Sequence, residues 1–221
     1  MSEAIGSILP LAVAAAISPF PIIGVVLMLT TPRARVNGPL FIVGWLVGLG
    51  VVGAIGLTLA GAAAGDDGET STFVTVVKVV LGLALVLLAV QQWRRRPAAG
   101  ESPELPTWMS AVDDFTPVRA TVMGFVLSAL NPKNLILTLA ATASIAATSL
   151  STGDQVIVFA VYVAIATLGV GIPVVTYFVM GERSATVLED LKTWLSVHNS
   201  AIMAVILLVI GVKILGDALT G

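Results

Sequence analysis

Asn131-Pro132-Lys133-Asn134-Leu135 lies in the middle of an apolar run that extends from about residue 121 to residue 147. A proline inside a helix removes one backbone hydrogen bond and crowds the preceding turn, so this stretch predicts a broken helix. A charge at the centre of a membrane helix costs about 2.5–3.5 kcal/mol on insertion scales, and such charges usually mark a functional position. The alternative is a plain kink whose polar groups satisfy one another.

A second break is predicted at Ser18-Pro19-Phe20-Pro21, which interrupts the first apolar run of the chain at a similar depth. Two broken helices in corresponding positions of two halves indicate the binding site of a transporter. We therefore expect the two breaks to face each other near the bilayer midplane.

Composition places the chain among membrane proteins. Of its 221 residues, 57% are hydrophobic and 11% are charged, with a mean hydropathy of +1.02. These values are too apolar for a soluble domain and fit a chain that crosses a membrane several times.

Six runs are long enough to cross a bilayer, which takes about 20 apolar residues. They cover residues 5–30, 39–62, 73–93, 119–147, 155–180 and 200–219. We predict helices, because backbone groups in hydrocarbon must be satisfied internally and the runs lack the polar and apolar alternation of barrel strands.

Basic residues predict the orientation of these spans. Lysine and arginine accumulate on the cytoplasmic side of membrane proteins. The loops after the first, third and fifth spans carry eight basic residues: Arg33, Arg35, Arg94, Arg95, Arg96, Arg119, Arg183 and Lys192. The loops at 63–72 and 148–154 carry none and hold Asp66, Asp67, Glu69 and Asp154. Both termini are therefore expected outside the cytoplasm, with the protein in the plasma membrane.

An odd number of spans per half makes the second half enter the membrane from the opposite side, which is an inverted-topology repeat. We predict a first three-helix repeat at 1–93, a cytoplasmic linker at 94–118 with a short interfacial helix at 107–115, and a second repeat at 119–221. Small residues let membrane helices approach closely, so Gly44 and Gly48 are expected to pack helices within or between protomers of a homodimer.

The chemistry available inside the spans is sparse. No acidic residue lies in the interior of a predicted span, since Asp217 is near the end of the last one; there is no cysteine, and His198 is the single histidine. Metal binding, proton relays through carboxylates and hydrolytic catalysis are disfavoured on these grounds. No phosphate-binding Walker motif is present, so direct use of ATP is unexpected. We expect no enzymatic activity, no cofactor and no nucleic-acid partner.

The remaining polar groups suit an anion. A helix that restarts after a proline directs backbone N–H groups and the positive end of its dipole toward the break. The candidate substrate-binding residues are Asn131, Pro132, Lys133 and Asn134, with Ser18, Pro19 and Pro21 opposite. Lys78 is a weaker candidate, because its long stem can carry the amine to the outer interface. Candidates for a cytoplasmic gate or for contact with lipid headgroups are Arg33, Arg35, Asn37 and Asp113.

These residues carry a resemblance to the GAP (Sap) family of actinobacterial membrane proteins, within the broader lysine-exporter superfamily of six-span transporters. The matching pieces are Ser18-Pro19-Phe20-Pro21-Ile22, Thr31-Pro32-Arg33-Ala34-Arg35 with Asn37-Gly38 and Gly44-Trp45, Trp108-Met109 with Asp113 and Pro117, and Asn131-Pro132-Lys133-Asn134-Leu135. Together they cover the chain nearly end to end. The resemblance implies a role in moving or addressing cell-envelope glycolipids, such as the sulfolipid and glycopeptidolipid of mycobacteria, and does not identify the lipid.

The expected function is export or flipping of an anionic or glycosylated envelope lipid. One alternative is an exporter of a small solute such as an amino acid, which would need a closed polar cavity rather than a path open to the bilayer. Another is a membrane adaptor that recruits envelope-synthesis machinery through residues 94–115.

Overall fold

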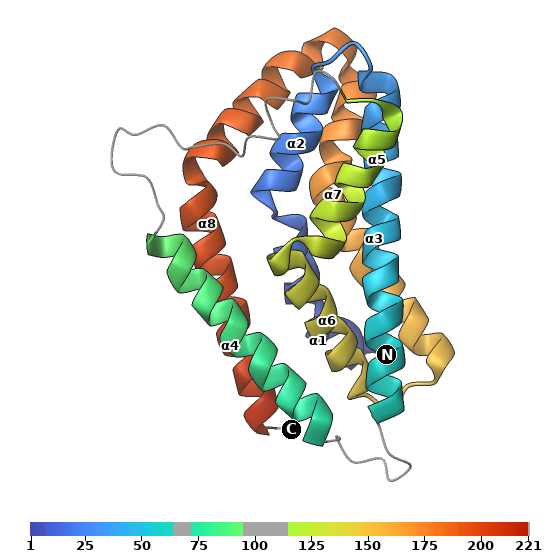
Figure 1. Ribbon diagram of the computed structural model, residues 1–221, viewed down its shortest axis with the longest axis vertical. Helices are drawn as coiled ribbons and strands as arrows, with labels where there is room; N and C mark the ends of the chain where they lie inside the picture. The colour runs from blue at the N-terminus through green and yellow to red at the C-terminus, as the bar shows by residue number, and fades with distance from the viewer. Residues whose placement is uncertain (64–71, 95–114, 221) are drawn as a thin grey trace.

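The structure, a computed structural model, describes residues 1–63, 72–94 and 115–220. This part of the chain consists mostly of helices and contains no strand (Figure 1). The helices are α1 (Ser2–Ala16), α2 (Pro19–Leu29), α3 (Ala34–Ala63), α4 (Thr72–Arg94), α5 (Pro117–Phe125), the π turn η2 (Val126–Leu130), α6 (Pro132–Ala146), α7 (Thr152–Met180), the 3-10 turn η3 (Gly181–Arg183) and α8 (Ser184–Thr220). The predicted interfacial helix, apart from Phe115, and the predicted loop carboxylates Asp66, Asp67, Glu69 and Asp113 lie outside the described residues.

Both predicted helix breaks are confirmed. The axes of α1 and α2 differ by 49°, and the break falls between Ala16 and Pro19. The axes of the helical segments on either side of Asn131 differ by 60°, with η2 before the break and Pro132 after it. Proline opens α2 and α6, because it lacks an N–H and is tolerated at the first position of a helix.

Among the described residues, three stretches are long and apolar enough to cross a membrane: Ala34–Gly61, Thr75–Arg94 and Thr152–Leu219. Counting each bent pair as one span raises the number to five. The third stretch contains α7, η3 and α8, and therefore both of the last two predicted spans. Its two long helices run in opposite directions, since the chain follows α7 to one end of the molecule and returns along α8 (Figure 1).

Helices pack closely where small residues meet backbone. A Cβ atom on Gly44 of α3 would overlap the carbonyl oxygen of Thr121 in α5, and one on Gly124 of α5 would overlap the carbonyl oxygen of Phe41. In the other half, a Cβ on Gly169 of α7 would overlap the carbonyl oxygen of Ala16 at the end of α1. Gly44 and Gly48 therefore pack within the protomer, where a larger side chain would push α5 and η2 away from α3.

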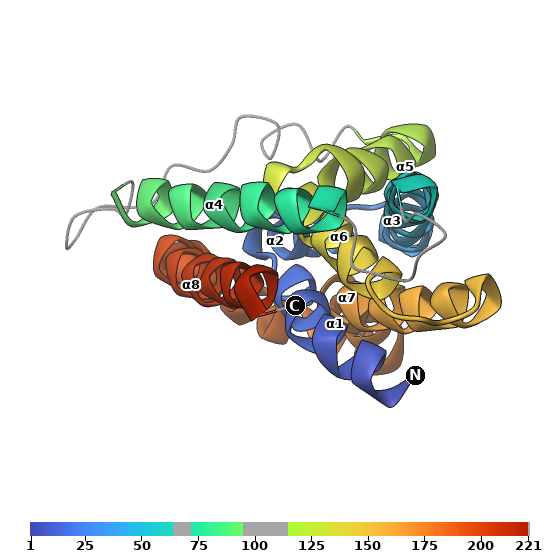
Figure 2. The same ribbon diagram turned by 90° about the horizontal axis from the view of Figure 1, so that it is seen from below.

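The helices α4 and α8 form a pair at one side of the molecule, next to the broken helices (Figures 1 and 2). Their backbones meet at Gly82 and Gly211, because a Cβ on either residue would approach the carbonyl oxygen of the other. The pair contacts α2 through α8 and α6 through α4, so both broken helices have one of its members as a neighbour.

Candidate functional site

The first break places the C-terminal end of α1 beside the second break. α1 ends at Ala16, and Ser18 is in extended conformation as the N-cap residue of α2. The Ser18 hydroxyl makes no capping bond and instead lies 3.5 Å from the side-chain oxygen of Asn134, a long hydrogen bond to the other broken helix. The backbone carbonyl of Ile17 points to the same region, where it accepts a hydrogen bond described below.

The second break is held together by its two asparagines. The five residues of η2 form a π turn that closes with a bond from the Asn131 N–H to the Val126 carbonyl. The Asn131 side chain then caps α6 by accepting from the Lys133 N–H at 3.1 Å. The Asn134 amide donates to the Leu127 carbonyl at 2.9 Å, so it satisfies an acceptor freed by the break. π turns inside α-helices occur frequently at functional sites.

Lys133 connects the two breaks. It is 5% exposed, and its Nζ donates to the Ile17 carbonyl at 2.9 Å and lies 3.8 Å from the Met203 sulfur of α8. The described residues place no carboxylate in an ion pair with it. The carbonyl partner belongs to the C-terminal end of α1, where the helix dipole favours a positive charge. Lys133 is thus a buried amine at the C-terminal end of α1 that donates to one neutral acceptor.

A cavity of about 140 Å³ lies beside this lysine. It is lined from both breaks and from the α4–α8 pair by Ser18, Pro19, Phe20, Leu88, Gln92, Asn131, Pro132, Lys133, Met203 and Leu207. Five of the sequence-predicted residues therefore share one cavity. Asn134 and Pro21 are buried, but they do not line it.

The helix N-termini offer fewer free donors to this cavity than the sequence suggested. α2 begins at Pro19, so Pro21 falls inside its first turn and two of the first three positions have no N–H. At α6 the Pro132 position has none, and the Lys133 N–H is already bonded to Asn131. The lysine amine is therefore the strongest donor at the site.

The polar side chains continue from the break along one face of α6. Asn134, Thr138 and Thr142 are spaced by four residues and are at most 1% exposed. The Thr138 hydroxyl donates to the Asn134 carbonyl at 2.7 Å and lies 3.1 Å from the buried Tyr162 hydroxyl of α7. Asn134 was predicted as a site residue, but the continuation of the stripe through Thr138 and Thr142 was not. The cavity residues Phe20, Leu88, Gln92, Met203 and Leu207 were not predicted either. Only Gln92, a polar residue near the end of an apolar span, gave a signal in the sequence.

Lys78 is not brought to the cavity. It is a buried residue of α4, close to Asp217 and Lys213 of α8, and those two form an ion pair of 2.5 Å with each other. The cavity contacts α4 at Leu88 and Gln92, about three turns further along the helix.

The predicted cytoplasmic residues are separated by the fold. Asn37 is buried and donates to the Phe115 carbonyl at 2.9 Å, which ties the start of α3 to the segment before α5. Arg33 and Arg35 are exposed. Arg35 lines a second cavity of about 400 Å³ at the ends of α2 and α7, together with Glu182 at the turn before α8.

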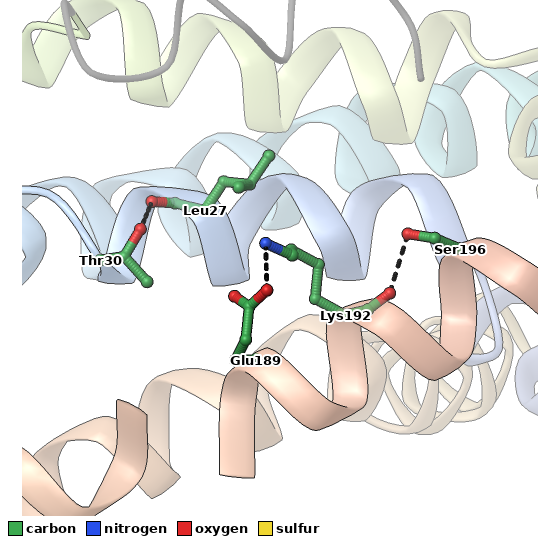
Figure 3. Close-up of polar contacts among 5 residues, drawn as sticks. All are labelled: Leu27, Thr30, Glu189, Lys192 and Ser196. Carbon is green, nitrogen blue, oxygen red and sulfur yellow. Dashed lines mark hydrogen bonds and ion pairs between the residues drawn. The ribbon is translucent and has the colours of Figure 1, made fainter. Parts of the chain in front are cut away.

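The first turns of α8 lie beside α2 and carry satisfied polar groups (Figure 3). Lys192 pairs with Glu189 at 2.7 Å, and Ser196 donates to the Lys192 carbonyl at 2.8 Å. Thr30, at the end of α2, donates to the Leu27 carbonyl at 2.8 Å. Because local partners use these groups, we do not consider them candidate site residues.

Residues 8–220 match the protein family described as "Sap, sulfolipid-1-addressing protein". The chain belongs to this family. The match covers nearly the whole chain, including both breaks and the α4–α8 pair, and agrees with the resemblance found in the sequence. No curated protein and no solved structure matches the chain.

Family membership supports a role of this membrane protein in placing a cell-envelope lipid. The description names a sulfolipid, whose headgroup is anionic, and one of the residues that line the cavity is a buried lysine. Membership in the wider lysine-exporter superfamily stays a prediction.

Proposed function

We propose that this protein exports or flips an anionic or glycosylated envelope lipid across the plasma membrane. The observation that carries the proposal is Lys133, which is buried, has no carboxylate partner among the described residues and faces a cavity between two helix breaks. Its amine would bind the anionic group of the lipid headgroup in place of the Ile17 carbonyl. A charge-assisted hydrogen bond of this kind contributes about 1.5–3 kcal/mol.

The proposal includes six spans, obtained by dividing the Thr152–Leu219 stretch at the Gly181 turn and counting each bent pair once. Both termini would then lie outside the cytoplasm, as the basic loops predict. A homodimer remains part of the proposal, although Gly44 and Gly48 are used inside the protomer.

Reciprocal packing supports an inverted repeat. The repeat would exchange α1 with α5, α2 with α6, α3 with α7 and α4 with α8. Under this exchange the contact of α1 with α7 corresponds to that of α5 with α3. The same exchange relates α2–α8 to α6–α4 and α3–α6 to α7–α2, and it leaves α4–α8 unchanged. A repeat of this type would place the two breaks at corresponding depths.

Two contacts of α1 depart from this symmetry: a smaller one with α8, whose exchanged pair α5–α4 makes little contact in the described residues, and a larger one with α6. α1 packs extensively on α6, whereas the exchanged pair, α5 and α2, makes little contact in the described residues. In the proposed orientation α1 and α6 are the outer halves of the broken spans. The arrangement is therefore closed toward the outside, and the outward-facing state would exchange the α1–α6 contact for one between α2 and α5.

An exporter of a small zwitterionic or anionic solute is the second candidate, and the cavity volume of about 140 Å³ favours it, because that space holds a small group rather than a whole lipid. The lipid proposal requires the acyl chains to stay in the bilayer while only the headgroup enters the cavity. A membrane adaptor is the third possibility, and it would need neither the buried lysine nor the volume of the cavity.

The experiment that separates these functions measures movement in liposomes that contain the purified protein. A headgroup-labelled anionic lipid should change leaflets faster than in protein-free liposomes, and trapped radiolabelled amino acids should remain inside. Efflux of the amino acid without lipid movement would select the solute exporter. Absence of both activities, with the protein folded and inserted, would refute transport and favour the adaptor.

A further inference from the structure

The α4–α8 pair has a second hollow on the face opposite the lysine cavity. This groove, about 380 Å³, is lined by Ala89, Val90, Trp93 and Arg94 of α4 and by Ala204, Val205 and Leu208 of α8. The lysine cavity is lined by Leu88 and Gln92 of α4 and by Met203 and Leu207 of α8. Adjacent residues of the same two helices thus line the two hollows at the same level.

Small side chains lie between α4 and α8 at the level of the two hollows. Ala89 and Ala204 line the groove and are 3% and 5% exposed, so each is enclosed between the helices. Further along the pair the backbones are in close contact at Gly82 and Gly211. The helices are therefore in close contact near the middle of α4, and alanines lie between them at the end that carries the groove.

The chemistry of the groove fits a lipid. Its lining is apolar except at one end, where Arg94, an exposed residue without an ion pair to another described residue, follows Trp93. Tryptophan and arginine concentrate at the membrane interface, and a basic residue there attracts anionic headgroups. Val90 and Val205, 45% and 56% exposed, open the groove toward the bilayer.

We propose that this groove binds an acyl chain of an anionic lipid, with the acidic headgroup at Arg94, and that it is the position from which the lipid substrate reaches Lys133. The inference rests on the proposed function and names the route of its substrate. The headgroup would pass between α4 and α8 at Ala89 and Ala204, while the chain remained in the groove. A zwitterionic lipid would bind there more weakly, because Arg94 attracts a net negative charge.

The test uses liposomes and phosphatidylglycerol with a photoactivatable diazirine on one acyl chain, followed by mapping of the labelled peptides. In the parent protein the label should concentrate on residues 89–94 and 204–208. The Val205→Trp variant fills the groove from its exposed rim, and labelling there should fall about tenfold, the effect of about 1.4 kcal/mol. Val209→Trp is the matched control, because Val209 is 60% exposed on the same helix and does not line the groove.

A separate variant tests the preference of the groove for an anionic lipid headgroup. Arg94→Gln should remove the preference for phosphatidylglycerol over a phosphatidylcholine probe of the same chain, whereas Arg119→Gln, which changes an exposed arginine of α5 away from the groove, should keep it. Equal labelling in Val205→Trp and Val209→Trp, or label spread evenly over all lipid-facing helices, would overturn the proposal. A cross-link between two copies of the chain at this groove would overturn it as well.

Lipid flipping, measured together with the labelling, distinguishes failure of lipid binding in the groove from failure of lipid transport. Val205→Trp should lose flipping together with groove labelling, while Lys133→Gln should lose flipping and keep the labelling. Groove labelling without flipping in the parent protein would leave the lipid site standing and refute the proposed function. Normal flipping by Val205→Trp would refute the route through the groove.

Discussion

At the scale of single residues, the two asparagines beside Lys133 make backbone contacts that the sequence did not predict. Both were predicted to bind substrate, and both are engaged with backbone: Asn131 caps α6 and Asn134 satisfies the Leu127 carbonyl. The sequence predicted that polar groups would gather at the break, because proline frees backbone acceptors. It could not predict how these groups pair, because the pairing depends on the π turn and on the position of the other broken helix.

This difference can be measured by thermal and chemical unfolding. Asn134→Ala removes a buried donor and leaves the Leu127 carbonyl unsatisfied, so it should lower the free energy of unfolding by about 1–3 kcal/mol. Ser18→Ala should cost less than about 1 kcal/mol, because its bond to Asn134 is 3.5 Å long. A larger loss for Ser18→Ala than for Asn134→Ala would contradict the assigned contacts.

At the scale of helices, the breaks were predictable and the partners of the helices were not. Prolines next to small polar residues mark both breaks in the sequence, and the structure places α2 and α6 after them. By contrast, the apolar runs of the third and last spans do not show which helices pack together. Positions that face hydrocarbon and positions that face another helix are equally apolar. The lining of the cavity by α4 and α8, and the exclusion of Lys78 from it, therefore had to come from the structure.

Glycines in α3 provide a test of helix packing. Gly44→Ala should lower the free energy of unfolding by about 1–3 kcal/mol, because the new methyl group overlaps the Thr121 carbonyl of α5. Gly50→Ala is the matched control in the same helix, where a Cβ meets no atom within 4 Å, and it should stabilise the helix by about 0.5–1 kcal/mol. Equal effects of the two substitutions would refute close packing of α3 on α5.

At the scale of the whole molecule, the basic residues predict how the chain is oriented in the membrane. Cysteines placed at the two ends of α7 test this orientation. Gly153 and Glu182 are exposed at opposite ends of this helix. The sequence contains no cysteine, so a single one gives an unambiguous signal. Gly153→Cys should react with a membrane-impermeant thiol reagent in intact cells, and Glu182→Cys should react only after permeabilisation. Reversed labelling would place the termini in the cytoplasm.

The central claim is that Lys133 binds the anionic group of a transported lipid, and the most direct measurement is lipid binding and flipping by Lys133→Gln in liposomes. Lys78→Gln is the control, since it removes another buried lysine that does not line the cavity. We predict that Lys133→Gln stays folded and inserted but loses about one to two decades of affinity and its flipping activity, while Lys78→Gln keeps both. Lys133→Arg should recover only part of the activity, and Lys133→Glu should be worst, because a carboxylate would face the Ile17 carbonyl. Binding and flipping by Lys133→Gln at the level of the parent protein would contradict the account.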